Sequence, residues 1–348
     1  MNPNRAIRHG VCRAAIATCL TFVPVLAGAQ AARDPGLARL EAEIQRLSTI
    51  SGGKVGVGIV HLESGRELFV NRDEPFPMAS TFKVPVAVQV LTLVDSGKVR
   101  LDSMITLAPS DLHPGSGTLT QLFNQPGVSL SVRNVMELML LISDNSAADL
   151  MLRTAGRAPA VNARLATLGV KGISVDRPTV ALIADALGVK NLPPENELTP
   201  QRFRELMRAV TPEDRKAAAE SFSHDRRDTS TPEGMARLLE KIWKRQALSG
   251  ASTDLLLDIM RRCQTGPERI KGMLPPGVVV MHKTGTLNNG ITDDVGIITL
   301  PNDAGHLVLT VFVKEAKVDE ATQERTIAQI ARAAYDYFTF NVGGKSAN

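Results

Sequence analysis

The stretch Met78–Val90, Met-Ala-Ser-Thr-Phe-Lys-Val-Pro-Val-Ala-Val-Gln-Val, constrains the fold of this chain more than any other. Ser80 and Lys83 stand three positions apart, so on a helix both side chains lie on one face. Most residues after Lys83 are apolar, on more than one face of such a helix. A helix that is apolar all round is buried in the protein. The stretch therefore predicts a core helix whose first turn holds a serine and a lysine in a dry setting.

These two residue types can perform nucleophilic catalysis. A serine hydroxyl attacks well only when a base removes its proton, and a lysine amine becomes such a base when burial or another cation lowers its pKa. Free backbone N–H groups at a helix start can stabilise a developing oxyanion. The pattern alone is weak, because an exposed serine and lysine on a helix give the same spacing. Ser51-Gly52-Gly53-Lys54 also matches it, but two glycines disfavour a helix there.

The first 29 residues are predicted to be a secretory signal peptide. Arg5, Arg8 and Arg13 give it a basic start. Ala14–Leu26 is apolar but short for a bilayer span, and Ala27-Gly28-Ala29 offers a cleavage site. The alternative is an N-terminal membrane anchor. Cleavage predicts a periplasmic or secreted protein without a stable membrane anchor.

Charge and cysteine content exclude several classes of function. The leader holds three arginines and no acidic residue, so its removal lowers the formal net charge from +4 to +1. A chain this close to neutral gives no reason to expect a nucleic-acid partner. Cys263 is then the one remaining cysteine, so no internal disulfide can form. His113 and His224 stand alone and no cluster has metal-ligand spacing, so we expect neither a metal nor another cofactor.

The order of the expected elements indicates an α+β fold. Helices are expected near both ends, at 36–47 and 319–338. Strand patterns also gather toward the two ends of the chain, at 55–62, 67–70, 278–282, 294–300 and 306–313. We therefore expect an antiparallel sheet built from both termini with flanking helices, plus an all-helical insert domain. The expected α/β half, which carries the sheet and the Ser80 helix, comprises 30–100 and 251–348, and the helical half comprises 101–250.

Two further motifs follow Ser80 along the chain. Ser143-Asp144-Asn145 stands where a buried helix stops. A capped helix end is the plain interpretation, and a second hydroxyl with a substrate-orienting amide is the functional one. Lys283-Thr284-Gly285 ends a strand. The lysine is either an edge charge that deters aggregation or a cleft residue, and Gly285 leaves room for a ligand backbone to pair with the strand.

The three motifs in this order, Ser80-x-x-Lys83, Ser143-Asp144-Asn145 and Lys283-Thr284-Gly285, resemble the signature of class A β-lactamases and penicillin-binding proteins. The resemblance covers about residues 36–338. The stretch 294–301 is also similar to the strand that follows the lysine motif in some branches of that family. The resemblance implies a β-lactamase/transpeptidase-like fold and a monomer that acts on a small β-lactam or a peptidoglycan-like substrate.

The resemblance also implies a specific role in acyl transfer for several residues. Ser80 would be acylated by the β-lactam carbonyl, with Lys83 helping to take its proton. Ser143 would pass that proton to the departing lactam nitrogen. The backbone N–H groups of Ser80 and Thr286 would form the oxyanion hole.

Four more residues are implied in substrate binding. Asn145 would hold the side-chain amide of the substrate, and Lys283 and Thr284 would meet its carboxylate. Arg269 looks like an arginine that some branches of the family use for the same carboxylate. The alternative for Arg269 is a surface position near a helix end.

The chain departs from the family pattern over about 177–228. Family members carry an omega loop here, but this one is much longer and has helical segments of its own. Arg177 and Asp228 are expected to close it as an ion pair. The glutamate that activates the deacylating water in family β-lactamases is missing, since Thr179 stands two positions after Arg177. Three carboxylates are possible substitutes, and spacing does not choose among them: Asp185, Glu195 and Glu197.

The missing glutamate leaves three functions open. The first is a periplasmic serine β-lactamase that works through an acyl-enzyme on Ser80. The second is a DD-peptidase or another serine acyl-transfer hydrolase. The third is a slowly deacylating penicillin-binding module, because an acyl ester persists when no general base activates water.

Overall fold

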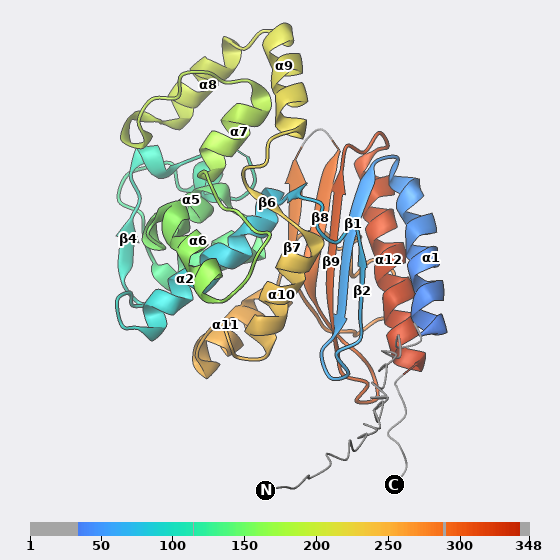
Figure 1. Cartoon of the computed structure of the whole chain (residues 1–348). Coiled ribbons are helices and arrows are strands. Elements are labelled where there is room, and N and C mark those ends of the chain that lie inside the picture. The colour runs from blue at the N-terminus through green and yellow to red at the C-terminus, as the bar shows by residue number, and fades with distance from the viewer. Residues whose placement is uncertain (1–33, 114, 288–289, 342–348) are drawn as a thin grey trace, which may run out of the picture. The chain divides into compact units, whose positions relative to one another are not determined.

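The computed structural model describes residues 34–113, 115–287 and 290–341 (Figure 1). The predicted signal peptide, 1–29, lies outside the described residues. All helices and strands described below belong to the unit that begins at Pro35. Within these residues no helix combines the length and the apolar character that crossing a membrane requires.

A five-stranded sheet is built from both ends of that unit, in the order β2–β1–β9–β8–β7. Every neighbouring pair is antiparallel. The strands are β1 (Lys54–His61), β2 (Glu67–Val70), β7 (Val280–Leu287), β8 (Ile291–Thr299) and β9 (His306–Lys314). The α+β fold with an antiparallel sheet from both termini is therefore confirmed, and β7 is an edge strand.

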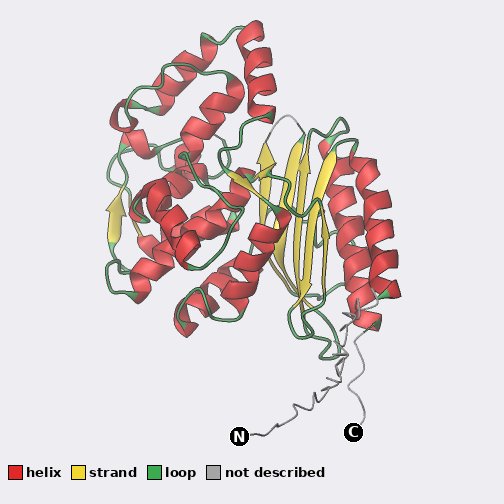
Figure 2. Ribbon diagram, in the orientation of Figure 1, coloured by secondary structure: helices red, strands yellow, loops and turns green. Residues whose placement is uncertain are grey.

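Helices cover both faces of the sheet, as Figure 2 shows. On one face α1 (Pro35–Ser48) and α12 (Glu320–Phe340) share a buried apolar cluster with alternate residues of β1, such as Val57 and Ile59. On the other face α10 (Pro232–Trp243) packs against β1 and β9. Gly56 allows this close approach, because a side-chain Cβ there would lie 2.7 Å from Pro232 Cγ at the start of α10.

The segment between β2 and β7 is mainly helical. Besides α10, its helices are α2 (Lys83–Asp95), α3 (Leu119–Leu122), α4 (Val132–Leu141), α5 (Asn145–Thr154), α6 (Arg157–Thr167), α7 (Thr179–Leu187), α8 (Pro200–Arg208), α9 (Pro212–Ser223) and α11 (Gly250–Arg261). The segment is not purely helical, because short extended stretches that precede helices form two small antiparallel sheets of two strands each. These are β4 (Met104–Thr106) with β5 (Ser129–Ser131), and β3 (Phe76–Pro77) with β6 (Thr229–Ser230).

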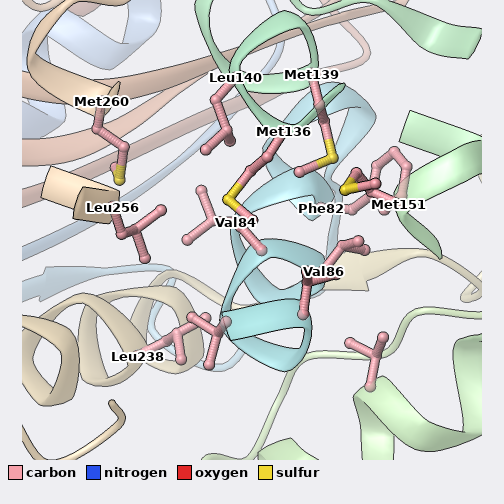
Figure 3. Close-up of a cluster of buried hydrophobic side chains, with 14 of the residues drawn as sticks. Phe82, Val84, Val86, Met136, Met139, Leu140, Met151, Leu238, Leu256 and Met260 are labelled. Carbon is pink, nitrogen blue, oxygen red and sulfur yellow. The ribbon is translucent and has the colours of Figure 1, made fainter. Parts of the chain in front are cut away.

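Helix α2 runs through the core, as its sequence predicts. Every residue from Lys83 to Leu91 is buried. Figure 3 shows the apolar side chains that surround its first turns, which come from α4, α5, α10 and α11: Met136, Met139, Leu140, Met151, Leu238, Leu256 and Met260. Ser80 lies just before this helix in a short 3-10 turn, Ala79–Phe82. The burial of α2 therefore fixes Lys83 in a dry setting and holds Ser80 at its entrance.

The long segment between Arg177 and Asp228, which we call the insert, contains α7, α8 and α9. Its ends meet in a buried ion pair, with Arg177 Nε 2.6 Å from Asp228 Oδ2. The other oxygen of Asp228 accepts the backbone N–H groups of Asp176 and Arg177. This confirms the expected closure. Because β6 follows Asp228 and pairs with β3, the insert is anchored beside the Ser80 turn.

Candidate active site

Ser143 lies at the centre of the site, in the turn between α4 and α5. Its φ of +58° is left-handed, a conformation that is uncommon for a residue other than glycine. The next residue, Asp144, caps α5 by accepting the N–H of Ala147 at 2.8 Å. The capped-end interpretation is therefore confirmed, and the functional one stays a prediction. Asp144 ends one helix and starts the next, while Ser143 turns inward.

Lys83 directs its amine at this turn. Its Nζ lies 2.7 Å from Ser143 O, 3.1 Å from Ser143 Oγ and 3.0 Å from Asn145 Oδ1. Burial lowers the pKa of Lys83 well below its usual value, and the nearby charge of Lys283 lowers it further. A neutral amine has two N–H groups and one lone pair. The two carbonyl oxygens can accept the N–H groups, which leaves the lone pair for a hydroxyl proton.

Lys283 reaches the same hydroxyl from the sheet. Its Nζ lies 3.0 Å from Ser143 Oγ and 2.8 Å from Thr284 O. Although β7 is an edge strand, this side chain is completely buried. The interpretation of Lys283 as a solvent-facing edge charge is therefore wrong, because the helical half covers this face of the strand. Burial lowers the pKa of Lys283 to about 8.

Three titratable side chains behind Lys283 set its electrostatic surroundings. His282 Nδ1 lies 2.9 and 3.0 Å from the two carboxylate oxygens of Asp294. Burial alone would lower the pKa of His282, but Asp294 and Cys263 raise it to about 9. Burial alone would raise the pKa of Cys263, but His282 and Lys283 lower it to about 6. The resulting negative charges of Cys263 and Asp294 keep the pKa of Lys283 from falling further.

Ser80 lines a cavity of about 690 Å³ together with Ser143, Asn145 and Thr284. Among the described residues its hydroxyl has no hydrogen-bond partner, and the Lys83 amine points to Ser143 and Asn145 instead. Catalytic hydrogen bonds often tighten only when substrate is present. Ser80, Ser143 and Asn145 come from distant parts of the chain and line this cavity, whereas Lys83 and Lys283 lie outside its lining and reach it through the Ser143 hydroxyl.

Gly285 brings strand β7 against the Ser80 turn. A Cβ at this position would lie 2.7 Å from Met78 O and 3.0 Å from Ala79 Cβ. The space that a side chain would fill is therefore taken by the protein's own Ser80 turn. This close packing places Thr284 and Thr286 beside Ser80 in the wall of the cavity.

Arg269 is buried rather than at the surface, so the alternative of a surface arginine is wrong. A guanidinium has five N–H donors, and five acceptors surround it. They are Gly285 O (2.8 Å), Asp293 O (3.0 Å), Thr286 Oγ1 (2.7 Å), Glu320 Oε1 (3.2 Å) and Glu324 Oε1 (3.0 Å). Because the Thr286 oxygen accepts from Arg269, its own proton is free to face the cavity. The geometry makes Arg269 a residue that positions Thr286 and β7.

Sequence reasoning missed two hydroxyl residues at the site. Ser116 Oγ lies 2.7 Å from Ser143 O and 3.2 Å from Asn145 Oδ1, so its single proton can be donated to either oxygen. Thr265 Oγ1 lies 2.5 Å from Thr284 Oγ1. Both belong to segments without regular structure, where no periodicity marks a residue as inward-facing. The Gly115-Ser116-Gly117 spacing was the one available signal for Ser116.

Thr179 occupies the position where the family glutamate was expected. It is the first residue of α7, and its hydroxyl is buried without a hydrogen-bond partner among the described residues. Asp149 accepts the N–H groups of Thr179 and Val180 at 2.6 and 3.1 Å. Asp149 also contacts His113 Nδ1 at 2.6 Å, so His113 is not isolated as its sequence context suggested. The insert therefore presents a capped helix start to the cavity.

None of the three suggested substitute bases lines the cavity. Asp185 pairs with Arg177 and Arg227 at the base of the insert. Glu195 pairs with Arg157 on the protein surface, and Glu197 is exposed. Within the described part of the chain, the cavity lining includes no aspartate or glutamate.

The site brings together the Ser-x-x-Lys, Ser-Asp-Asn and Lys-Thr-Gly motifs that are typical of class A β-lactamases and penicillin-binding proteins. A family model described as the β-lactamase enzyme family matches residues 39–338, and this chain belongs to that family. The enzyme is thus a serine hydrolase of the type that acts on cyclic amides.

Individual relatives agree with this assignment. β-Lactamase VEB-1 of Pseudomonas aeruginosa is 29% identical over 307 residues, which are 86% of this chain and 90% of that protein. The extended-spectrum β-lactamase PER-1 of the same organism is 28% identical over 315 residues, or 89% and 90% of the two chains. A solved β-lactamase from Chitinophaga pinensis superimposes with a TM-score of 0.70 at 31% identity, covering 86% of this chain and 98% of the other.

Proposed function

We propose that this chain is a periplasmic or secreted, monomeric β-lactamase that works through an acyl-enzyme on Ser80. One observation carries the proposal. The Ser143 hydroxyl lies within 3.1 Å of two buried lysine amines, in the wall of the cavity that Ser80 lines. This arrangement joins a nucleophile, a base and a proton donor in one dry pocket.

The proton path follows from the charge states. Neutral Lys83 takes the Ser80 proton as the Ser80 oxygen bonds to the lactam carbonyl carbon. When the lactam C–N bond breaks, the Ser143 hydroxyl gives its proton to the nitrogen and regains one from Lys83. Lys283 stays positively charged at neutral pH, so it attracts the substrate carboxylate together with Thr284 and keeps Lys83 neutral.

Residues on two sides of the cavity, the helical side and strand β7, bind different parts of the substrate. Asn145, on the helical side, holds the side-chain amide of the substrate. Thr284 and Thr286, on β7, meet its carboxylate, with Arg269 holding Thr286 in place. The backbone N–H groups of Ser80 and Thr286 hold the oxyanion.

Intact-protein mass spectrometry tests the proposal. When the reaction with a chromogenic cephalosporin is stopped by acid shortly after mixing, before the ester is hydrolysed, wild-type protein should carry the mass of one acyl group. Ser80→Ala should gain none, because the nucleophile is gone, whereas Ser96→Ala, an exposed serine at the end of α2, should behave as wild type. Labelling of the Ser80→Ala variant would contradict the assignment of the nucleophile.

A specific observation favours a second candidate, a penicillin-binding module or DD-peptidase that deacylates slowly. No carboxylate side chain lines the described cavity, so water has no general base beside the ester. The time course separates the candidates. A β-lactamase hydrolyses cephalosporin continuously, a slow module keeps its adduct for hours, and a DD-peptidase releases D-alanine from a peptide.

A further inference from the structure

The cavity beside Ser80 extends well beyond the polar residues of the site, into the insert. Helix α7 contributes Ile183 and Leu187, and helix α8 contributes Phe203 and Met207. Residues four positions apart lie on the same face of a helix, so each helix presents a pair of apolar side chains to the cavity. We call this part of the cavity the annex. Its apolar lining favours a ligand that brings apolar surface of its own.

The annex begins where the substrate side chain is expected to leave the site. A Cβ at Gly115 would touch Asn145 Nδ2 on one side and lie 3.4 Å from Ile183 Cδ1 on the other. Asn145, the proposed partner of the substrate amide, and the first apolar residue of the annex are therefore neighbours. A side chain attached to that amide would pass from Asn145 directly along Ile183.

Two arginines that are also exposed to solvent belong to the cavity lining. Arg204 of α8 and Arg215 of α9 line the same cavity. Among the described residues neither guanidinium has a hydrogen bond or an ion pair, whereas Arg202, two residues away, pairs with Glu205 at 3.1 Å. No acidic side chain in the described lining neutralises them. Free guanidinium groups bind carboxylates with paired N–H donors.

We propose that the annex binds the acyl side chain of the substrate, and that the preferred side chain is a long apolar arm ending in a carboxylate. This assignment rests on the proposed function, and it adds the substrate class that the insert selects. The apolar arm covers the faces of α7 and α8, and its terminal carboxylate meets Arg204 and Arg215. A short acyl group would leave this apolar surface in contact with water.

Three cephalosporins with one nucleus and different acyl groups test the proposal: acetyl, hexanoyl and adipoyl. The measurement is the second-order rate constant for acylation of the full-length mature chain. The hexanoyl compound should react about tenfold faster than the acetyl compound, because its extra methylenes are buried in the annex. The adipoyl compound should react several-fold faster again, and this second gain should shrink at high salt.

Two variants separate the apolar and the charged contributions. Met207→Gln, a change of similar size, should slow the hexanoyl and adipoyl compounds and leave the acetyl compound unchanged. The double variant Arg204→Gln/Arg215→Gln should make the adipoyl and hexanoyl rates equal. The control Arg202→Gln, a residue of α8 that does not line the cavity, should keep all three wild-type rates.

The outcomes distinguish this assignment from the proposed function. Acylation of Ser80 at one rate by all three compounds would overturn the annex and leave the proposed function standing. A carboxylate preference that survives in the double arginine variant would also overturn it. No acylation by any of the three would overturn the proposed function and the annex with it.

Discussion

The two buried lysines at the site have different pKa values because their surroundings differ. Both amines are completely buried and both contact the Ser143 hydroxyl. Burial lowers the pKa of Lys83 well below its usual range, and the charge of Lys283 lowers it further, although Asp144 and Asp149 oppose the shift. Lys283 has the negative Cys263 and Asp294 behind it, which limit its fall to about 8. One lysine is thereby fitted to be a base, and the other to be a cation.

This difference predicts how acylation depends on pH. Above pH about 8 Lys283 loses its proton, so the rate constant for acylation by a carboxylate-bearing β-lactam should fall. Lys283→Arg keeps a positive charge, and its profile should stay flat across the same pH range. Stopped-flow acylation at pH 6 to 10 measures both. A decline near pH 8 that is unchanged in Lys283→Arg would assign the titration to another group.

Thr179 stands at the position where the resemblance predicted a general base for deacylation. Thr179 is part of the cavity lining, which includes no carboxylate side chain among the described residues. Thr179→Glu should shorten the lifetime of the acyl adduct by about 100-fold or more, because a positioned general base contributes about 10²–10⁴. Thr179→Gln has the same size and no basic group, so it should keep the wild-type lifetime. Equal lifetimes for the Glu and Gln variants would show that the missing base does not limit deacylation.

At the scale of elements, the insert places the start of helix α7 at the cavity, where the family pattern predicts an omega loop. Asp149 of α5 accepts both first N–H groups of α7, which fixes that helix against the helical half. Apolar residues of α7 then line the cavity. The stability of this wall depends on the closure of the insert at Arg177 and Asp228.

Breaking that closure should loosen the insert. Arg177 and Asp228 are 7% and 2% exposed, so Asp228→Asn leaves a buried guanidinium without its main partner. The free energy of unfolding should fall by on the order of 3 kcal/mol. Asp185→Asn removes a partner that is 40% exposed and should cost much less. Thermal unfolding gives the stability change, and hydrogen exchange should rise within residues 177–228 for Asp228→Asn alone. Equal effects in the two variants would rule out the buried pair as the closure.

At the scale of the whole sheet domain, the site lies where separate parts of the chain meet. The turn before α2, the α4–α5 turn, strand β7 and the insert each contribute one wall. The sheet is formed by strands from the two ends of the unit, so β7 can pack against the Ser80 turn although about two hundred residues separate them. The proposed chemistry therefore depends on the tertiary fold as a whole.

The sequence by itself determined the α+β fold, the buried α2 helix, the closing ion pair and the family. These follow from local periodicity and from motifs whose spacing is preserved along the chain. The same motifs named Ser80, Lys83, Ser143, Asn145, Lys283 and Thr284 as candidate site residues, and their roles stay predictions.

Only the tertiary structure decided the surroundings of these residues. It buried Arg269 among five acceptors, brought Ser116 to Ser143, and placed Asp185, Glu195 and Glu197 away from the cavity. Burial, charge pairing and cavity shape depend on contacts between residues far apart in sequence, and no local pattern records them. Whether the acyl-enzyme turns over depends on such contacts, because a general base acts only where the fold positions it beside the ester.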